Sequence, residues 1–224
     1  MKIQDLSVRF KDNVVYDNFS IDFDNQKITC ILGPSGCGKT TLLNVLTNNV
    51  KYTGNVLDLE KYAYVFQNSR LIESITVEEN LKFVINKEDY LKIDKVLEDI
   101  EILDCKKKYP RQLSGGQASR VAIARAIIYN PKVILMDEPF KDLDIILTKK
   151  LLEQFRDLAI KNSLGAIYVT HNVDEALSIA DRIIVLSKSP AKAVLDIDIN
   201  SDHLDLSSKE LNIARQKIYS ALSI

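Results

Sequence analysis

Eight consecutive residues near the start of the chain constrain its fold and chemistry most: Gly33-Pro34-Ser35-Gly36-Cys37-Gly38-Lys39-Thr40. They follow the apolar run 28–32, which reads as a strand, and precede residues 41–46, which have the composition of a helix. The spacing G-x-x-x-x-G-K-[ST] between a strand and a helix is typical of a phosphate-binding loop. Glycines allow the backbone to curl around an anion with its amide N–H groups pointing inward, and the following helix adds the positive end of its dipole.

The loop therefore predicts a nucleoside triphosphate as ligand. Lys39 would reach the β- and γ-phosphates, and the Thr40 hydroxyl would ligate a magnesium ion. The thiol of Cys37 stands among backbone amides at a helix start, where a thiolate is favoured. We accordingly expect alkylation of Cys37 to block nucleotide hydrolysis, and bound nucleotide to protect the thiol.

The composition of the whole chain excludes several classes of protein. Its 224 residues suffice for one domain, and 30 basic against 31 acidic residues give no basic excess that would favour a nucleic-acid partner. No apolar run reaches the roughly 18 residues that span a bilayer, and charge comes too early at the N-terminus for a signal peptide. The three cysteines are scattered along the chain and predict reduced thiols in a cytosolic protein.

Hydrophobic patterns predict alternating strands and helices. Strands are expected at 3–10, 14–16, 19–23, 28–32, 62–66, 133–136, 166–170, 182–186 and 192–199, with a turn at 53–55. Helices are expected at 41–46, in a charged block at 76–108, after 113–117, and at 145–162, 172–180 and 207–221. The run 62–66 reads as a strand buried on both faces, and residues 207–210 as a capped helix start.

This order of elements predicts an α/β fold with a mainly parallel core sheet and an N-terminal antiparallel β section. We expect a single domain, with its core at 1–71 and 131–224. A helical subdomain at about 72–130 would be inserted into that core.

Two adjacent carboxylates end one of the apolar strands. Asp137 directly follows the run 133–136, and Glu138 comes next. A carboxylate at the end of the strand beside a phosphate loop is suited to hold the magnesium ion. A second one at the same edge of the sheet would lie where a water molecule attacks the γ-phosphate, so Glu138 is the candidate general base.

The stretch Leu113-Ser114-Gly115-Gly116-Gln117 supplies a second anion-binding element, because a serine and two glycines open a helix there. With the phosphate loop and Asp137-Glu138, in this order and spacing, the chain resembles the ATP-binding-cassette (ABC) ATPases over residues 3–190. The resemblance implies two cassettes that sandwich two ATP molecules head to tail. The LSGGQ residues of one cassette would then serve the ATP bound by its partner.

The resemblance implies roles for further residues. Gln67 resembles the glutamine that senses magnesium and the γ-phosphate, and Asp144 the aspartate that crosses the dimer interface. His171 resembles the histidine that contacts the γ-phosphate, and Phe10 the aromatic residue stacked on adenine. Residues implied at the nucleotide are Phe10, Gly33, Pro34, Ser35, Gly36, Cys37, Gly38, Lys39, Thr40, Thr41, Gln67, Ser114, Gly115, Gly116, Gln117, Asp137, Asp144 and His171. Those implied in catalysis are Lys39, Gln67, Glu138 and His171, and those at the magnesium ion are Thr40, Gln67 and Asp137.

The stretch 66–71, together with 76–80, looks like the importer branch of the family, most similar to ATPases of the nitrate, sulfonate and taurine type. This implies an ATP-hydrolysing subunit held at the cytoplasmic face of the membrane by permease partners. A second ATPase subunit, expected to be an identical copy, and an extracytoplasmic solute-binding protein would complete the system. The chain length leaves little room for the regulatory domain of sugar-importer ATPases.

Four positions depart from the family pattern. Lys141 and Asp142 stand where small residues are usual, and Ala118 and Ser119 replace the polar or basic residues common after LSGGQ. The first pair would alter communication between the two ATP sites, and the second would alter contacts to the ribose of the partner's nucleotide. His203 has no such context and is expected at the surface.

Two alternatives of other classes remain at this stage. A soluble cassette ATPase of DNA repair would carry a long coiled-coil insert, and one of translation two cassettes in one chain. A P-loop phosphotransferase would transfer phosphate to an acceptor other than water. The transported substrate, the direction of transport and the choice between homodimer and heterodimer stay open.

Overall fold

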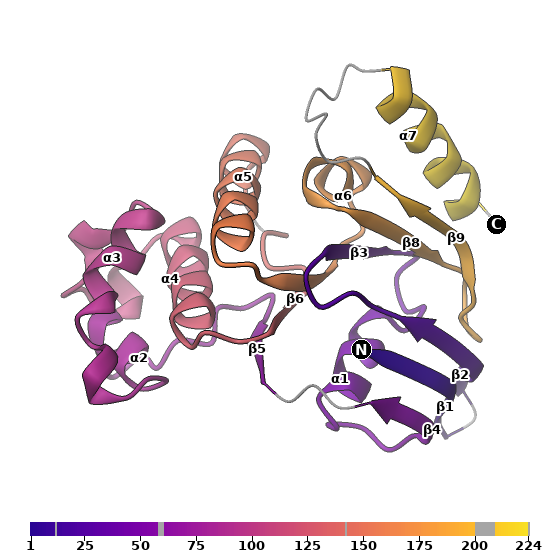
Figure 1. Cartoon of the computed structure of the whole chain (residues 1–224), viewed down its shortest axis with the longest axis horizontal. Coiled ribbons are helices and arrows are strands. Elements are labelled where there is room, and N and C mark those ends of the chain that lie inside the picture. The colour runs from indigo at the N-terminus through magenta and orange to yellow at the C-terminus, as the bar shows by residue number, and fades with distance from the viewer. Residues whose placement is uncertain (12, 58–60, 142, 200–208, 224) are drawn as a thin grey trace.

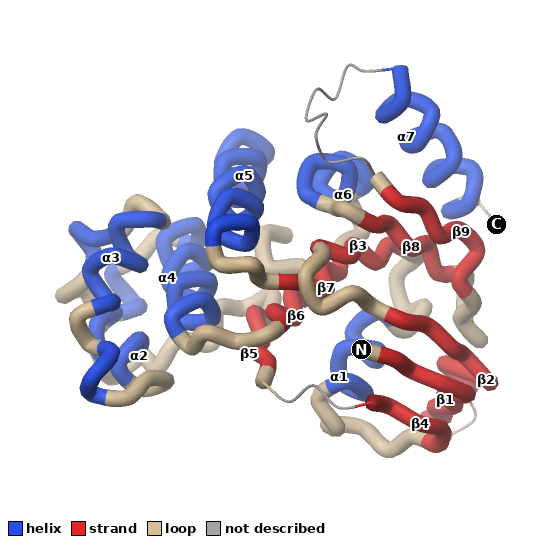
Figure 2. Tube along the Cα trace, viewed as in Figure 1, coloured by secondary structure: helices blue, strands red, loops and turns tan. Residues whose placement is uncertain are grey.

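The computed structural model describes residues 1–11, 13–57, 61–141, 143–199 and 209–223, which contain two β-sheets (Figure 1 and Figure 2). The strands are β1 (Lys2–Phe10), β2 (Asn13–Asp22), β3 (Ile28–Leu32), β4 (Thr53–Leu57), β5 (Tyr62–Val65), β6 (Val133–Asp137), β7 (Gly165–Val169), β8 (Arg182–Leu186) and β9 (Ala193–Asp198). The helices are α1 (Lys39–Leu46), α2 (Val77–Lys82), α3 (Lys92–Asp99), α4 (Gly115–Ile128), α5 (Ile145–Lys161), α6 (Val173–Ile179) and α7 (Lys209–Leu222). Short 3₁₀ turns cover Lys87–Asp89, Leu103–Cys105 and Pro110–Gln112.

The larger sheet has the order β5-β6-β7-β3-β8-β9 and is parallel except for β9 at one edge. One face packs against α1 and the smaller sheet, and α5, α6 and α7 lie over the other face (Figure 1). Because both faces are covered, β3 and β7 are buried along their whole length, which explains their continuous apolar runs. The predicted α/β fold with a mainly parallel core sheet is confirmed.

The smaller sheet is antiparallel, with the order β2-β1-β4, and it differs from the sequence prediction in two places. The segments 14–16 and 19–23 form most of one strand, β2, which bends at register shifts in its pairing with β1. The predicted turn at 53–55 is wrong, since these residues begin β4. Gly54 allows this pairing, because its φ is +108° and a Cβ there would lie 2.5 Å from the carbonyl oxygen of Asp5.

The charged block 76–108 is not one continuous helix. It is divided into α2 and α3, with one 3₁₀ turn before α3 and another after it. Asn86 takes an extended backbone conformation and Glu101 a left-handed one, and each interrupts the helical ladder. Both short helices pack on α4, and α4 in turn packs against β5 (Figure 1). The boundaries of a separate helical subdomain stay an interpretation.

The structure also differs from the sequence prediction at β5 and at α7. β5 is the edge strand of the larger sheet, so Tyr62, Ala63 and Tyr64 are only partly buried, and the prediction of burial on both faces is wrong. The final helix α7 begins at Lys209, and its expected capping residues Ser207 and Ser208 lie outside the described residues. Within the described chain, no helix is both long and apolar enough to cross a bilayer.

The parallel strands bring distant parts of the sequence to one edge. In register, Val65 pairs with Met136, Asp137 with Val169, and Ile31 also with Val169. The segments that follow β3, β5, β6 and β7 therefore leave the sheet at the same carboxyl edge. Ligands of parallel α/β sheets bind at this edge.

Candidate active site

The loop between β3 and α1 curls around the ammonium group of Lys39. The side chain is buried, and Nζ donates hydrogen bonds to the carbonyl oxygens of Gly33 at 2.7 Å and Pro34 at 3.0 Å. Gly36 has a φ of +77° and no heavy atom within 4 Å of the position its Cβ would take, so the loop faces open space there. This is the geometry of a cradle for a phosphate group.

Strand β2 packs against the phosphate loop, a contact that the sequence did not predict. The Tyr16 hydroxyl donates a hydrogen bond to the carbonyl oxygen of Gly38 at 2.9 Å. A Cβ on Gly38 would lie 2.6 Å from Cγ1 of Val15, and the φ of Gly38 is +114°. Only glycine allows the loop to approach β2 this closely. The alternating apolar residues of β2 were visible in the sequence, but their packing partner was not.

The expected reactive thiol of Cys37 is contradicted by the structure. The side chain is only 2% exposed and turns inward, so that a Cβ on Gly33 would lie 2.8 Å from its Sγ. Burial raises the pKa of the Cys37 thiol above its ordinary value, and the nearby charge of Lys39 opposes this only in part. The thiol form is therefore favoured, and the prediction of a favoured thiolate is wrong.

Thr40 and Asp137 meet at the edge of the sheet. The Thr40 hydroxyl donates a hydrogen bond to Oδ1 of Asp137 at 3.0 Å, and the Tyr64 hydroxyl donates one to Oδ2 at 3.3 Å. Burial raises the pKa of the Asp137 carboxyl, while these two hydrogen bonds lower it. Tyr64 lies on β5 beside β6 and was not predicted as a site residue, although its place three residues before Gln67 points to the same edge.

The donor set suits Mg²⁺. A hydroxyl and a carboxylate oxygen are hard ligands, and Mg²⁺ is commonly held by one or two protein oxygens together with substrate phosphates and water. No cluster of three or more His, Cys, Asp or Glu side chains that could hold a metal occurs among the described residues. The residues present thus fit a magnesium ion that arrives with the nucleotide, and Tyr64 would orient its carboxylate ligand.

Glu138 is held in an unusual backbone conformation, with a φ of +45°. Its amide donates a hydrogen bond to the carbonyl oxygen of Val169 at 3.0 Å, which fixes it beside β7. Oε2 of its carboxylate lies 3.2 Å from Nδ1 of His171 and 3.2 Å from Nζ of Lys141. Because a carboxylate only accepts, the contact with His171 is a hydrogen bond when Nδ1 carries the proton. Non-glycine residues in this backbone region are uncommon and cluster at functional sites.

The position of His171 is fixed by the residues on either side of it. The Thr170 hydroxyl donates to the carboxylate of Glu175 at 2.7 Å, and the Asn172 side chain caps α6 by accepting from the amide of Asp174 at 2.9 Å. The ring itself is exposed. The backbone around His171 is therefore held in place by its neighbours, while the ring points towards Glu138 and the solvent. A residue that contacts a bound ligand needs such a position.

Gln67 and Phe10 both lie at the surface. Gln67 is exposed two residues beyond the end of β5 and makes no hydrogen bond to another described residue. Phe10 ends β1 with 47% of its surface exposed, paired with the first residue of β2, the strand that packs under the loop. An exposed aromatic ring is available for stacking on a base, but both assignments stay predictions.

The residues of the LSGGQ stretch lie elsewhere in the chain. Ser114 caps α4, accepting from the amide of Gln117 at 3.3 Å, while the Gln117 side chain accepts from the amide of Ser114 at 3.0 Å. Gly116 packs tightly on Leu147, and Asp144 caps α5 by accepting from the amide of Leu147 at 2.9 Å. Figure 1 shows α4 well separated from α1, so one chain does not bring these residues to its own phosphate loop.

The structure describes three of the four residues that depart from the family pattern. Lys141 contacts Glu138, as described above. Ala118 packs against the core, and the Ser119 hydroxyl donates to the carbonyl oxygen of Pro139 at 3.4 Å, which joins α4 to the loop after Glu138. Asp142 and His203 lie outside the described residues.

Arg125 links helix α4 to the loop after β5, and the sequence did not predict this role. Its guanidinium group donates to the carbonyl oxygen of Arg70 at 2.9 Å and of Ser69 at 3.0 Å, so α4 is linked to the loop that follows Gln67. Burial lowers the pKa of Arg125, which nonetheless stays charged at any physiological pH. Its position on the otherwise apolar stripe of α4 was the available sequence signal.

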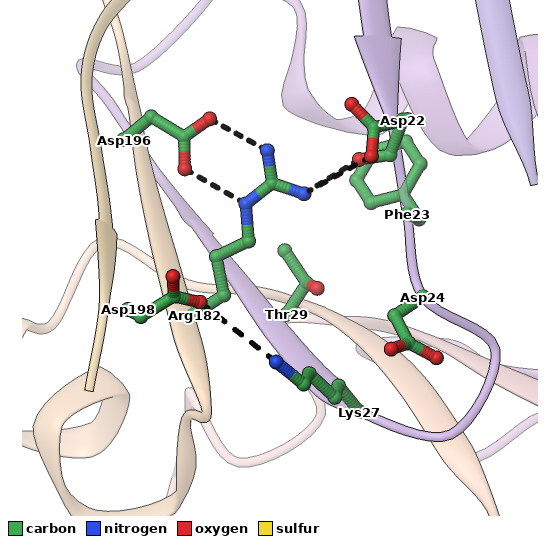
Figure 3. A pocket seen from close by; sticks show the side chains of 8 residues that line it. All are labelled: Asp22, Phe23, Asp24, Lys27, Thr29, Arg182, Asp196 and Asp198. Atoms are coloured by element: carbon green, nitrogen blue, oxygen red, sulfur yellow. Dashed lines mark hydrogen bonds and ion pairs between the residues drawn. The ribbon is translucent and has the colours of Figure 1, made fainter. Parts of the chain in front are cut away.

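A polar pocket of about 660 Å³ lies at the opposite, amino-terminal edge of the parallel strands (Figure 3). There Arg182 donates to both carboxylate oxygens of Asp196, at 2.7 and 2.6 Å, and to the carbonyl oxygen of Asp22 at 2.8 Å. Arg182 thus links the two sheets through β2, β8 and β9. This pocket lies at the end of the sheet opposite to the phosphate loop.

Comparisons with known proteins agree with this arrangement. The sequence profile of the ABC transporter family matches residues 16–141. The Fe(3+) ions import ATP-binding protein of Fusobacterium nucleatum is 38% identical over 206 residues, which cover 83% of this chain and 55% of that protein. The aliphatic sulfonates import ATP-binding protein of Bacillus cereus is 35% identical over 190 residues, which cover 80% of this chain and 76% of that protein.

A dimeric structure of a bacterial ABC transporter cassette superposes with a TM-score of 0.76 at 28% identity, covering 88% of this chain and 97% of that one. The chain spans little more than half the length of the iron-import relative. The family match extends over more than half of this chain and includes the phosphate loop, the LSGGQ stretch and Asp137-Glu138. The chain belongs to the ABC transporter family.

Proposed function

We propose that this chain binds and hydrolyses ATP as the energy-supplying subunit of a membrane importer of a small solute. The observation that carries the proposal is the convergence of two pairs at one edge of the sheet. Thr40 and Asp137 lie 3.0 Å apart, and Glu138 and His171 lie 3.2 Å apart. One pair suits the magnesium ion of the nucleotide and the other suits an attacking water molecule.

Each residue has a role that its geometry supports. Lys39 would exchange its contacts with Gly33 and Pro34 for phosphate oxygens, and Thr40 and Asp137 would hold Mg²⁺, which neutralises charge on the phosphates. Glu138 would accept a hydrogen bond from water and draw away its proton. His171 would hold that water against the γ-phosphate, and the amides of the loop would stabilise negative charge as it develops.

We further propose that two copies of the chain form the working unit. Ser114, Gly115 and Gly116 begin α4 with exposed or small residues, yet they lie apart from the phosphate loop of the same chain. A head-to-tail pair would bring them to the nucleotide of the partner. The fold match with a dimeric cassette supports such a pair.

Membrane permease subunits would then hold the pair at the cytoplasmic face of the membrane, and an extracytoplasmic binding protein would deliver the solute. The relatives described above are named for iron and for sulfonate import, two chemically unlike solutes, at similar identity. Comparable sequence identity to ATPase subunits of importers for such different solutes is expected if other subunits select the solute. Kinship with the nitrate, sulfonate and taurine branch belongs to this proposal, as do the roles of Phe10 and Gln67.

Mixed dimers test the composite site directly. Lys39→Ala removes the phosphate contact, and Gly115→Asp places a negative charge at the start of α4. The second change should be tolerated by the fold, because a Cβ at Gly115 meets only Leu143 at an ordinary 3.5 Å. Each variant alone should be inactive, whereas a mixture should recover part of the wild-type ATPase activity, because some dimers hold one intact site. A mixture as inactive as its parts would contradict the composite site.

Glu138→Gln tests the hydrolytic role. The variant should bind ATP, lose turnover and accumulate as a dimer in size-exclusion chromatography with ATP. Glu153→Gln, on the exposed face of α5, is the matched control and should behave as wild type. Phosphate transfer from ATP to an acceptor other than water, with no release of inorganic phosphate, would instead favour a phosphotransferase.

A further inference from the structure

The general-base candidate Glu138 has a second partner besides His171. Nζ of Lys141 lies 3.2 Å from Oε2 of Glu138, the same oxygen that lies 3.2 Å from Nδ1 of His171. The Lys141 ammonium and, when Nδ1 carries the proton, His171 therefore donate to the same carboxylate oxygen. The Glu138 side chain is only 17% exposed, while that of Lys141 is 44% exposed and approaches from the solvent side.

The backbone makes this contact possible. Glu138 has a φ of +45°, and the amide of Lys141 donates to its carbonyl oxygen at 3.3 Å, which closes a tight turn. The turn brings the side chains three positions apart onto the same side. The backbone of Glu138 is in turn fixed to β7, because its amide donates a hydrogen bond to the carbonyl oxygen of Val169.

We propose that Lys141 is a positioning residue that restrains hydrolysis by holding Glu138 in a resting ion pair. The proposal rests on the proposed function, in which Glu138 takes a proton from water. An oxygen that is already paired with the Lys141 ammonium is poorly placed to accept that proton. Lys141 must therefore withdraw, or its contact must lengthen, before the attacking water can be activated. Asp144, three positions further along the chain, belongs in the proposed function to the surface on which the second cassette would dock, so docking offers a means of withdrawal.

The solvent exposure of the Lys141 side chain limits how strongly its ion pair with Glu138 can slow turnover. Partly exposed ion pairs are weak, so the restraint should amount to roughly a two- to five-fold reduction in turnover, not to complete inhibition. Because salt screens exposed charges, the restraint should also weaken as ionic strength rises.

The test compares steady-state ATP hydrolysis by wild type, Lys141→Ser, Lys141→Arg and the control Lys149→Ser. Lys149 pairs with Glu153 on the exposed side of α5, so its loss removes an equal charge away from the site. Lys141→Ser should raise kcat about two- to five-fold with little change in KM for ATP. Lys141→Arg should stay near wild type because it keeps the charge, and Lys149→Ser should do the same.

Two further measurements separate this role from a structural one. The ratio of kcat for Lys141→Ser to that of wild type should fall towards one at about 0.5 M salt, where the screening length is only about 4 Å. The double variant Glu138→Gln with Lys141→Ser should be as inactive as Glu138→Gln alone, since Lys141 acts through that carboxylate.

The outcomes distinguish the two proposals. If Lys141→Ser is folded, with an unchanged thermal midpoint, and its kcat equals or falls below that of wild type, the restraint by Lys141 is wrong while the ATPase assignment stands. A gain in kcat shared by Lys149→Ser would also overturn it, because a general charge effect would explain the result. A wild-type chain that hydrolyses no ATP would instead overturn the proposed function itself.

Discussion

The hydroxyl group of Thr40 donates a hydrogen bond to the carboxylate of Asp137 at 3.0 Å, although 97 positions separate the two residues in the sequence. Thr40 lies in the first turn of α1, and Asp137 ends β6. Their contact exists because β3 and β6 are parallel strands of one sheet, both flanking β7. The magnesium site we propose is therefore a product of sheet topology.

Asp137→Asn should lower ATP turnover by roughly two orders of magnitude, because a group that holds charge-neutralising Mg²⁺ is lost. Binding of a fluorescent ATP analogue without Mg²⁺ should change little, since the phosphate loop is intact. ATPase assays across a Mg²⁺ titration measure the loss, with the exposed Asp157→Asn on α5 as control. A variant that keeps wild-type turnover at low Mg²⁺ would exclude Asp137 as a ligand.

The same substitution should stabilise the fold in Mg²⁺-free buffer at pH 7. Burial raises the pKa of Asp137 in the folded state, so the ionised carboxylate at neutral pH costs free energy that an amide does not. A group with a raised folded pKa favours the fold most below its unfolded pKa, about 3.9 for Asp, and less as pH rises. The gain in thermal midpoint over wild type should thus shrink as pH is lowered towards 4. A gain that grows on acidification would contradict the sign of this shift.

Tyr64→Phe should weaken the apparent affinity for Mg²⁺ in the ATPase reaction by about ten-fold, because Asp137 loses the hydrogen bond that orients it. Maximal turnover at saturating Mg²⁺ should fall much less. Tyr62→Phe is the matched control, since Tyr62 lies on the same strand two residues earlier. Equal Mg²⁺ dependence in the two variants would show that Tyr64 does not orient the ligand.

Glu78 should contribute stability that is lost in acid. Its carboxylate pairs with Lys107 and with Lys82, which lower its pKa to about 2. A depressed folded pKa stabilises the fold above the unfolded pKa, about 4.3 for Glu, and the contribution disappears as pH falls towards 2. Glu78→Gln should therefore lower the thermal midpoint at pH 7, and the difference from wild type should shrink below pH 4 and close only near pH 2. Glu88→Gln, an exposed change in the neighbouring 3₁₀ turn, should have little effect at either pH.

All three cysteines should resist alkylation in the native protein. Cys30, Cys37 and Cys105 are buried, and burial raises the pKa of Cys30 and Cys37. Mass spectrometry after brief iodoacetamide treatment should find them unmodified in buffer and fully modified in denaturant. Rapid labelling of Cys37 in buffer, blocked by ATP, would restore the reactive thiol predicted from the sequence.

Local patterns predicted the parts of the site that depend on short stretches of chain. The spacing of Gly33, Gly38 and Lys39 identified the loop, because its conformation is set by neighbouring residues. The apolar run before Asp137 identified a buried strand for the same reason. Cys37 shows the limit of this reasoning, since its side chain is buried in an apolar cluster that distant segments of the chain build.

Features that depend on contacts between distant segments escaped prediction. Gly54 looks like a turn residue, but its freedom at positive φ is used for a close approach to β1. Tyr64, Tyr16 and Arg125 have ordinary sequence surroundings, and only the assembled sheet shows what they bind. The ion pair of Glu138 with Lys141 depends on a left-handed residue at a strand end, which no propensity of glutamate would indicate.

Arg125 binds the main-chain carbonyl groups of residues 69 and 70 and none of the atoms that distinguish one amino acid from another there. Any residue supplies such a carbonyl group. The surface that follows Gln67 can therefore change its side chains while its attachment to α4 is preserved. This contact thus constrains the path of the main chain after Gln67 and leaves the choice of side chains at residues 69 and 70 open.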